Sequence, residues 1–433
     1  MNTSTNLEAS FDNSRMQAEL LRDVSKHNQQ QIIVDNVYGN NSEVVRKISL
    51  HKLRNAIFAG AVVTSAVLVP ASVFNKDIPL TAEIAKSDVY TAVSELWQMH
   101  PGSNEINSER FLARFRLNNG LFKNSDLGWY TSIWPSSVAL QALYTTSLLK
   151  KNNNYYVDFE KSLKALSQNY WSNSIANQSG YDQGLKVFHS HSDPPLVDDN
   201  LWMGLINMGV YNKTHNINDL IRAKKIFDLA TSQWDKKNGG VYWMVQLESA
   251  DNHIRAAVSN ASLISLGVEL YLDTHKVHYL KESEKIFDWI NSVLLDPSIG
   301  LYNDHITSSG YVDPVRYTYV QGIMIGAMVS LNRVNPIQYP LSNAIQLANN
   351  AMSYFQEHQI YGNPAFDAIW SQNLLRLASY YNNSSFIKRA KQSVSLALKA
   401  SPKSPRGLLD ASGDVVLQDL NKLPVSEYKK ILP

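Results

Sequence analysis

Residues 190–205 read SHSDPPLVDDNLWMGL, and the fold is organised around this change from a polar loop to an apolar helix. Pro194 and Pro195 end the loop, and the neighbouring carboxylates of Asp198 and Asp199 stand where the helical pattern begins. Aspartate is common in the first turn of a helix, where it accepts backbone N–H bonds and complements the helix dipole. Taken alone, the pair therefore favours a structural role at a helix start. Two acids at the mouth of a helix are also placed to face one cleft.

Two kinds of helix alternate in the sequence around this stretch. Residues 201–211 (LWMGLINMGVY) and 261–272 (ASLISLGVELYL) are nearly uncharged, which is typical of a helix buried on all sides. Residues 221–234 (IRAKKIFDLATSQW) and 280–294 (LKESEKIFDWINSVL) are amphipathic, with Lys and Glu on one side. The alternation predicts a layer of buried helices inside a layer of half-exposed ones.

An internal repeat joins one buried and one amphipathic helix into a unit of about 60 residues. Several identities recur at an offset of 60 residues: Thr214-His215 as Thr274-His275, the KIFD of 225–228 as that of 285–288, Asn200 as Asn260, and Leu220 as Leu280. Chance rarely produces so many identities at one spacing. Each unit is therefore interpreted as a helical hairpin.

Helical patterns continue along the rest of the chain, with no convincing period-2 strand pattern between them. They begin near residues 83, 131, 154, 197, 217, 254, 278, 318, 340, 365 and 384, and a short one covers about 409–420. Twelve helices make six hairpins, so we predict an all-α fold, an (α/α)6 toroid with inner and outer rings. The long loops then precede the inner helices, and their ends should line a shared bowl with Asp198, Asp199, Asn260, Tyr319 and Gln321.

The N-terminal part of the chain predicts an export or membrane segment. Residues 1–45 are polar and predict a disordered cytoplasmic tail. Basic residues at 46, 47, 52 and 54 precede an uncharged run, 55–74, which is long enough to cross a bilayer of roughly 30 Å. We expect residues 46–76 to be a transmembrane or signal-anchor segment, with Val69-Pro70-Ala71 as a possible cleavage site. Residues 83–433 would then be an exported domain, anchored at the cell surface or secreted.

The composition excludes several classes of function. The 433 residues carry a formal net charge of +2, so we expect no nucleic-acid partner. The chain has no cysteine, which excludes disulfides, thiolate zinc sites and cysteine nucleophiles. His189, His191 and Asp193 share one face of an extended loop, but there is no HExxH motif and no further histidine-rich partner. We therefore expect neither a metal nor a cofactor.

Four segments carry a family signature when they are taken together. They are Asp198-Asp199-Asn200 with Trp202, a Gly-rich turn ending in aromatics (234–243), an Asn-Ala stretch (257–261), and Thr318-Tyr319-Val320-Gln321-Gly322. In order and spacing they resemble the motifs of glycoside hydrolase family 76, the endo-α-1,6-mannanases, over roughly residues 90–420.

The chain departs from that family at several positions. Val320 stands where the family usually has Asn, and Leu201 where an aromatic is common. Arg255-Ala256 replaces a Lys-Asn, and the family's Cys before the Gly-rich turn is absent. These changes bear on substrate detail more than on the chemistry, because the acid pair is intact.

The resemblance implies a retaining glycoside hydrolase that cleaves α-1,6-linked mannan or a related cell-surface α-mannoside. It assigns Asp198 as the nucleophile and Asp199 as the general acid/base. Retention requires two carboxyl groups about 5–5.5 Å apart, one ionised and one protonated. A helix N-terminus favours the charged form of an acid, and a like charge nearby raises the pKa of its partner. Which Asp takes which role follows from the resemblance alone.

Aromatic and amide side chains are the candidates for substrate contacts. Rings such as those of the 22 Tyr and 9 Trp fill protein cores and also stack on sugar faces. Tyr242 and Trp243 lie in a loop that gives them little reason to pack, which favours a ligand contact. For Trp134, with Trp129 and Tyr130, core packing and sugar stacking are equally compatible with the sequence. The predicted substrate-binding set is Asn200, Asn260, Tyr319, Gln321, Tyr242, Trp243 and Trp134, although capping fits Asn260 equally well.

Three alternatives remain open from the sequence. The same site could transfer sugar to a wall glycan, a helical toroid could house epimerisation or uronyl hydrolysis, or the bowl could bind glycan without catalysis. The expected partners are a polysaccharide and, through the N-terminal segment, a membrane. We expect the chain to be a monomer.

Overall fold

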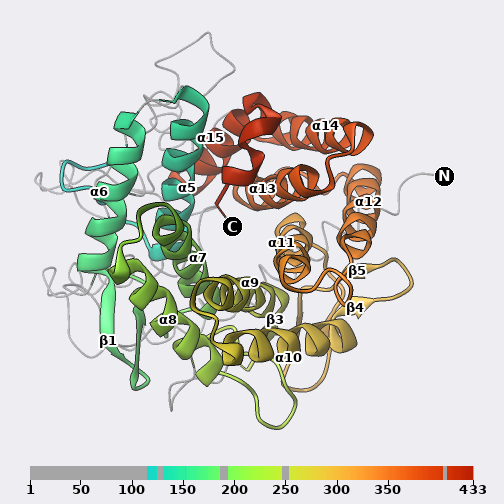
Figure 1. Ribbon diagram of the computed structural model, residues 1–433, viewed down its shortest axis with the longest axis horizontal. Coiled ribbons are helices and arrows are strands. Elements are labelled where there is room, and N and C mark those ends of the chain that lie inside the picture. The colour runs from blue at the N-terminus through green and yellow to red at the C-terminus, as the bar shows by residue number, and fades with distance from the viewer. Residues whose placement is uncertain are drawn as a thin grey trace, which may run out of the picture. The chain divides into compact units, whose positions relative to one another are not determined.

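The computed structural model describes residues 115–123, 130–151, 153–185, 194–245, 253–402 and 407–432. Within these residues, the long α-helices form two layers (Figure 1). The inner layer comprises α5 (Ile133–Lys150), α7 (Val197–Thr214), α9 (Ala257–Thr274), α11 (Thr318–Val334), α13 (Pro364–Tyr381) and α15 (Leu408–Lys422). The outer layer comprises α6 (Asn153–Asn169), α8 (Ile217–Ser232), α10 (Val277–Val293), α12 (Leu341–His358) and α14 (Ser384–Ala400).

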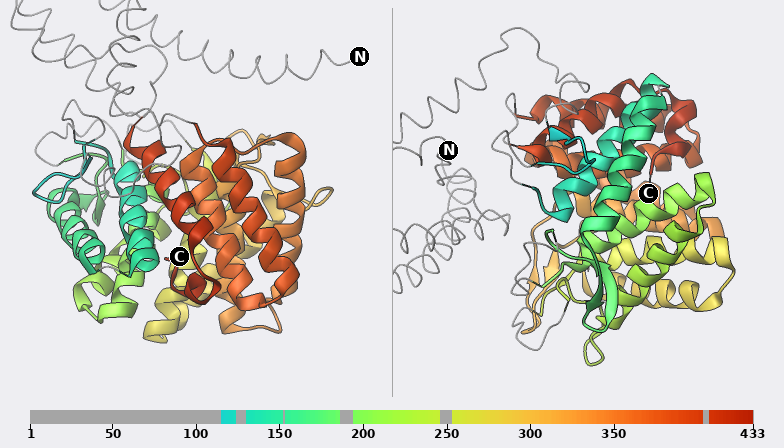
Figure 2. Two further views of the ribbon diagram at one scale, coloured as in Figure 1. Left: turned by 90° about the horizontal axis from the view of Figure 1, so that it is seen from above. Right: turned by 90° about the vertical axis from the view of Figure 1, so that its left-hand side faces the viewer.

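The inner helices close into a ring. Each packs against the next one in the chain, and α15 packs against α5. Each outer helix packs on the inner helix that precedes it, and seen from the side the helices stand next to one another along the wall (Figure 2). The predicted all-α ring of helical hairpins is therefore confirmed for the described residues. The helix predicted near residue 83 lies outside them.

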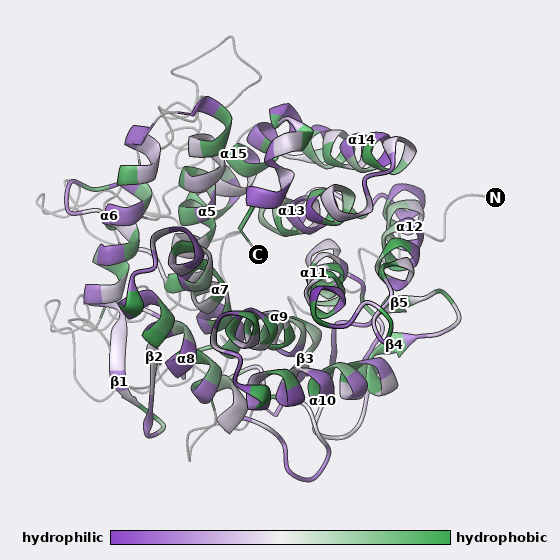
Figure 3. Cartoon of the chain, viewed as in Figure 1, coloured by the Kyte–Doolittle hydropathy of each residue, from purple (hydrophilic) through white to green (hydrophobic). Residues whose placement is uncertain are grey.

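Burial separates the two layers as the hydropathy pattern predicted. In α9 every residue from Ala257 to Leu270 is buried. In α10 the buried residues form one stripe: Tyr279, Ser283, Ile286, Trp289 and Ile290. Figure 3 shows the same division, with α9 mainly hydrophobic and hydrophilic residues along α6 and α10. Hydrophobic burial on all sides of the inner helices thus supplies the core of the ring.

The repeated Thr-His pair marks the end of an inner helix. His215 and His275 both adopt the left-handed conformation with φ of 55°, and their N–H groups donate to the carbonyls of Tyr211 and Tyr271. Histidine is one of the non-glycine residues that tolerate this conformation, which commonly ends helices. The repeated identity therefore reflects a repeated helix stop.

Short strands precede several inner helices, contrary to the expectation of an uninterrupted helical chain. β1 (Trp171–Ile175) pairs with β2 (Gln178–Tyr181), and β4 (Leu295–Asp296) with β5 (Leu301–Tyr302), both antiparallel. β6 (His305–Ile306) lies between β3 (Arg255–Ala256) and β7 (Val312–Asp313), antiparallel to both. Most of these strands have two residues, which is too short to produce an alternating pattern in a sequence.

The predicted N-terminal segments, residues 1–45 and 46–76, lie outside the described residues, so their assignment stays a prediction. In the part of the chain that is described, no helix is both long enough and apolar enough to span a bilayer.

Gly413 lies where α15 meets the start of α13, and it provides a test of ring closure. A Cβ atom at this position would overlap backbone atoms of Pro364 and Ala365, which cannot move aside without shifting a helix. We expect Gly413→Ala to lower the free energy of unfolding by about 1–3 kcal/mol, measured by chemical denaturation. Gly204→Ala is the control, because the nearest atoms to its Cβ would be side-chain methyls of Leu266 (2.8 Å) and Ile226 (3.1 Å), which give way at a lower cost than backbone. Equal stabilities of the two variants would contradict this packing.

Candidate active site

A cavity of about 360 Å³ lies at the N-terminal ends of the inner helices. Four helices contribute their second residue to its lining: Trp134 of α5, Asp198 of α7, Val258 of α9 and Tyr319 of α11. The other lining residues are Leu196, Asp199, Trp202, Trp243, Ile254, Ala256, Asp304, His305 and Phe366. The predicted convergence of inner-helix starts on one face is confirmed.

Asp198 and Asp199 lie in the first turn of α7, after the N-cap residue Leu196. Asp199 is buried, and Asp198 is half-buried. Asp198 accepts hydrogen bonds from the Trp243 side chain and from backbone N–H groups at the helix start. Oδ1 of Asp198 and Oδ2 of Asp199 have no hydrogen-bond partner among the described residues. Hydrogen bonding thus engages only part of each carboxyl group. In each of the two, one oxygen has no partner among the described residues.

Burial sets the protonation of the pair. It raises the pKa of Asp198 to about 7; the hydrogen bonds from Trp243 and the backbone lower this pKa, and the charge of Asp304 raises it. Burial also raises the pKa of Asp199 well above its ordinary value, with a further rise from the charge of Asp198 and an opposing hydrogen bond from Gln183. Two adjacent buried carboxyls resist ionising together. Because Asp198 has the greater number of donors, we infer that it carries the charge and Asp199 the proton.

A third carboxyl, that of Asp304, lies beside the pair and was not predicted from the sequence. It accepts a hydrogen bond of 3.1 Å from the Tyr319 hydroxyl, and its Oδ2 lies 2.8 Å from Nδ1 of His305. The hydrogen bond with Asp304 raises the pKa of His305. Burial, followed by the charges of Asp304 and Asp198, raises the pKa of Tyr319 well above its ordinary value, so Tyr319 is a neutral donor.

The structure places Asn200, Asn260 and Gln321, the three amides predicted as sugar contacts, outside the cavity lining, where their buried side chains bind backbone. Each is the fourth residue of its helix and bonds both backbone groups of a residue 19 positions earlier. Asn260 accepts from the N–H of Val241 (2.9 Å) and donates to its carbonyl (3.2 Å). Asn200 does the same with Tyr181 (2.6 and 3.0 Å), and Gln321 with Tyr302 (2.9 and 2.8 Å).

The segments held by these amides cross from one inner helix to the next. Each crossing segment also binds the inner helix that comes before it in the chain. The residue two positions after the amide-bound one accepts, through its backbone carbonyl, the first N–H of that helix. The pairs are Gln183 with Ile133 (3.1 Å), Trp243 with Val197 (2.8 Å), and Asp304 with Ala257 (2.7 Å). The side chains of the same three residues shift the pKa values of the acid pair: Trp243 and Asp304 that of Asp198, and Gln183 that of Asp199. The helical ring thus places Gln183, Trp243 and Asp304 around Asp198 and Asp199.

The remaining predicted residues divide between the cavity and its surroundings. Trp134 and Trp243 line the cavity, and the Trp134 ring centroid lies 5.8 Å from that of Trp202. Tyr242 does not line it: its side chain is hydrogen-bonded with Asp235, and its ring centroid lies 5.4 Å from that of His253. Outside the described residues lie Trp129, His189, His191 and Asp193.

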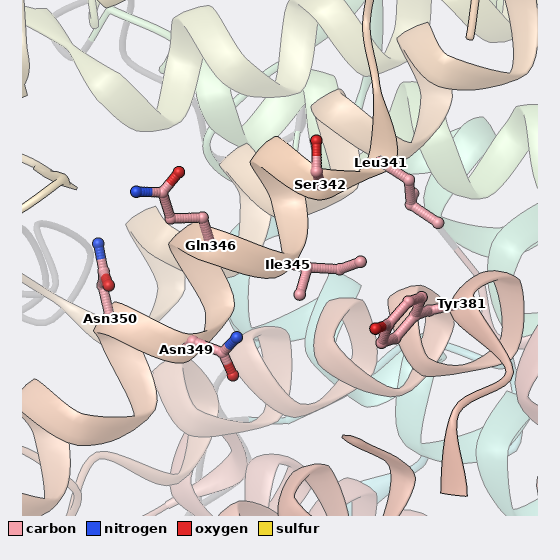
Figure 4. A pocket seen from close by; sticks show the side chains of 7 residues that line it. All are labelled: Leu341, Ser342, Ile345, Gln346, Asn349, Asn350 and Tyr381. Atoms are coloured by element: carbon pink, nitrogen blue, oxygen red, sulfur yellow. The ribbon is translucent and has the colours of Figure 1, made fainter. Parts of the chain in front are cut away.

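A second hollow lies on the outer helix α12, and its lining differs from that of the first (Figure 4). Its volume is about 550 Å³, and it is lined by Leu341, Ser342, Ile345, Gln346, Asn349, Asn350 and Tyr381. This set contains no carboxylate and no histidine. Of these two hollows, the one at the inner-helix starts is the one lined by carboxyl and imidazole groups.

Comparisons with known sequences identify a family and partial relatives of the chain. A family model described as glycosyl hydrolase family 76 matches residues 110–386. The mannan endo-1,6-alpha-mannosidase DCW1 of Eremothecium gossypii is 24% identical over 159 residues, which are 36% of this chain and 30% of that protein. Pre-mRNA-processing factor 39 of Saccharomyces cerevisiae is 25% identical over 218 residues, or 48% of this chain and 33% of that protein. The chain thus spans about a third of these curated relatives.

Solved structures share the fold at low sequence identity. The family 76 mannosidase Bt3792 of Bacteroides thetaiotaomicron is 18% identical with a TM-score of 0.62, covering 73% of this chain and 96% of that one. An inactive Salegentibacter α-1,6-mannanase, with two neighbouring aspartates replaced by alanine, is 16% identical with a TM-score of 0.60, covering 73% and 96%. That variant was solved with α-1,6-mannotetrose.

Loss of an amide that holds a crossing segment should destabilise the protein. Asn260→Ala leaves both backbone groups of the fully buried Val241 without their partner. Each unsatisfied buried group costs about 1–3 kcal/mol, so we expect the free energy of unfolding to fall by about 2–4 kcal/mol in urea denaturation. The control Asn218→Ala, at an exposed position of α8, should change it by less than about 0.5 kcal/mol. Similar losses in both variants would refute the structural role of Asn260.

Proposed function

The chain belongs to glycosyl hydrolase family 76, and from this premise we propose that it cleaves α-1,6-linked mannan, or a related α-mannoside, with retention of configuration. The observation that carries the proposal is the adjacent pair of carboxyls, Asp198 and Asp199, in one cavity at the start of α7. Glycosidic cleavage with retention needs one ionised and one protonated carboxyl. Burial and unequal hydrogen bonding support that state of the pair near neutral pH.

In the first step, the Asp198 carboxylate forms a bond to the anomeric carbon while the glycosidic C–O bond breaks. Asp199 gives its proton to the departing oxygen, so that the leaving group departs as a neutral alcohol. In the second step, the Asp199 carboxylate takes a proton from water as the water oxygen attacks the anomeric carbon. The bond from the anomeric carbon to Asp198 breaks as the bond to water forms, and both carboxyls return to their starting states.

The surroundings of the pair support this division of roles. The Trp243 side chain and the α7 backbone N–H groups donate to Asp198, which favours its ionised form. Asp199 is more deeply buried and receives a side-chain hydrogen bond from Gln183, and the charge on Asp198 favours its protonated form. The charge of Asp304 raises the pKa of Asp198. A further ionised carboxyl in the cavity is therefore disfavoured.

The proposed substrate class rests on the relatives and on the cavity. A curated relative is named a mannan endo-1,6-alpha-mannosidase, and a structural neighbour whose paired aspartates were replaced binds α-1,6-mannotetrose. In this chain the rings of Trp134, Trp243 and Tyr319 line the same cavity as the acids, and such rings stack on apolar sugar faces. We therefore retain these three as proposed substrate contacts.

We also propose that the catalytic ring acts outside the membrane. The basis is the basic cluster at residues 46–54 before the uncharged run 55–74, which orients a segment with its N-terminus in the cytoplasm. A cell-surface mannan is then on the same side as the cavity.

Asp198→Asn and Asp199→Asn test the assignment directly. We expect each variant to lose at least about 10³-fold in kcat/KM on α-1,6-mannan, measured by release of reducing ends. On an aryl mannoside, whose phenolate leaves without a proton, Asp199→Asn should still form the covalent intermediate, and Asp198→Asn should not. NMR of the first product should show the α-anomer. Products longer than the substrate would indicate transfer instead of hydrolysis, and unchanged turnover in either variant would sink the proposal.

The same variants carry a stability control. Burial raises the pKa of Asp198 from its ordinary 3.8 to about 7, so its contribution to stability is complete below pH 3.8 and is lost as pH rises through about 7. The pKa of Asp199 shifts in the same direction. Asparagine has no charge to bury, so both variants should unfold at equal or higher temperature than the wild type above pH 7. A large loss of stability would show that inactivity reflects misfolding.

The pH profile of kcat/KM should be bell-shaped. Activity should rise as pH increases through about 7, because Asp198 must ionise, and should fall at higher pH, where Asp199 loses its proton. Trp243→Phe removes the hydrogen bond that lowers the pKa of Asp198 and should move the acid limb to higher pH. Trp134→Phe is the control: it alters the cavity wall and should leave the limb in place. An acid limb that does not move in Trp243→Phe would contradict the role given to that side chain.

A further inference from the structure

Three aromatic rings lead out of the cavity on the side of α11 and α13. Tyr319 and Phe366 line the cavity, with their ring centroids 4.2 Å apart. Tyr317 stacks on Tyr319 at 5.5 Å with an interplanar angle of 30°, and meets Phe366 edge-on at 5.6 Å. The Tyr317 side chain is 36% exposed. The cluster therefore begins inside the cavity and ends at the protein surface.

Polar contacts at the two helix starts hold these rings in position. The Tyr319 hydroxyl donates to Asp304. The Thr318 hydroxyl donates to Asp367 at 2.8 Å, which joins the start of α11 to the start of α13. Asp367 also accepts the N–H of Gly362 at 2.8 Å. The exposed ring of Tyr317 is thus backed by two rings carried on helix starts that are joined by a hydrogen bond.

We propose that Tyr317, backed by Tyr319 and Phe366, is a stacking platform for an additional sugar ring of the α-mannan chain, outside the cavity. This inference rests on the proposed function, because it takes the cleaved bond to lie at Asp198 and Asp199. An exposed tyrosine presents a flat apolar face, which matches the C–H face of a pyranose. The platform is continuous with a cavity that is lined by two of its own rings.

The α-1,6 linkage gives such a platform a physical purpose. Each linkage passes through an exocyclic carbon and so contains one rotatable bond more than a linkage between two ring positions. Binding such a chain therefore orders more torsions, and that ordering reduces affinity. A pre-positioned ring that stacks on the next sugar offsets part of this cost without requiring new hydrogen bonds.

Tyr381 provides a matched control for Tyr317. It is 39% exposed, and its ring meets that of Phe386 at 5.4 Å, so it is also an exposed tyrosine backed by an aromatic ring. It is the last residue of α13, at the opposite end of the helix from Phe366, and it belongs to the second hollow (Figure 4). A general effect of removing a surface tyrosine would appear equally at both positions.

The test measures kcat/KM of the full chain on α-1,6-mannooligosaccharides of increasing length. In Tyr317→Ala, the loss on the longest substrate should exceed the loss on the shortest cleaved one by about 3- to 10-fold, the range expected for one lost ring contact. Tyr317→Trp should restore the length dependence, and Tyr381→Ala should match the wild type. A loss that is equal at every length, or absent at every length, would overturn the platform.

Failure of the platform and failure of the proposed function give different results. If the wild type cleaves no α-1,6-mannooligosaccharide, the proposed function fails, and calorimetric binding of the same oligosaccharides then tests the platform. Wild-type affinity that rises with chain length, together with loss of that rise in Tyr317→Ala, supports it. Wild-type affinity that does not depend on length, or a rise that Tyr317→Ala retains, overturns it.

Discussion

The pair of hydrogen bonds between the Asn260 amide and the backbone of Val241 is the interaction on which the site depends. Inside the ring, neither backbone group of Val241 can be left without a partner. The same pair of bonds recurs at Asn200 and Gln321, so three backbone segments are held against the starts of inner helices. Each segment then directs one side chain toward the acids: Gln183, Trp243 and Asp304. The same pair of hydrogen bonds, repeated by the fold, thus frames the cavity that contains the acid pair.

The acid pair opposes the stability that the rest of the ring provides. Burial raises the pKa values of Asp198 and Asp199, so their contribution to stability diminishes as pH rises, whereas a surface carboxylate has no such effect. The inner helices compensate with burial on all sides, as in α9, where a run of consecutive residues is removed from solvent. The pair that opposes stability above neutral pH thus lies at a helix start, where backbone N–H groups partly offset its charge.

The sequence predicted the ring, its two layers and the acid pair, because hydrophobic periodicity and the offset of 60 residues are local or periodic signals. It did not predict Asp304 or Gln183, whose positions depend on hydrogen bonds between residues far apart in the chain. The recurrence of Asn200 as Asn260 is visible in the sequence, where it fits a sugar contact as well as a structural role. Its cause is the need to satisfy buried backbone, and counting back from each amide to the crossing segment would have found the missing residues. The short strands escaped detection because two residues carry no period.

In the proposed mechanism, the chemistry depends on the inner helix that carries acids at its second and third positions. In α7 these positions hold Asp198 and Asp199, whereas α9 holds Val258 and Ser259. Among the described residues that line the cavity there is no lysine or arginine, so none of these side chains offsets two negative charges with a permanent cation. Consecutive positions keep both carboxyls in one buried space, and each therefore acts on the proton affinity of the other. In the proposed mechanism, adjacency and burial together favour retention of one proton by the pair, and the hydrogen bond from Trp243 favours the charge on Asp198.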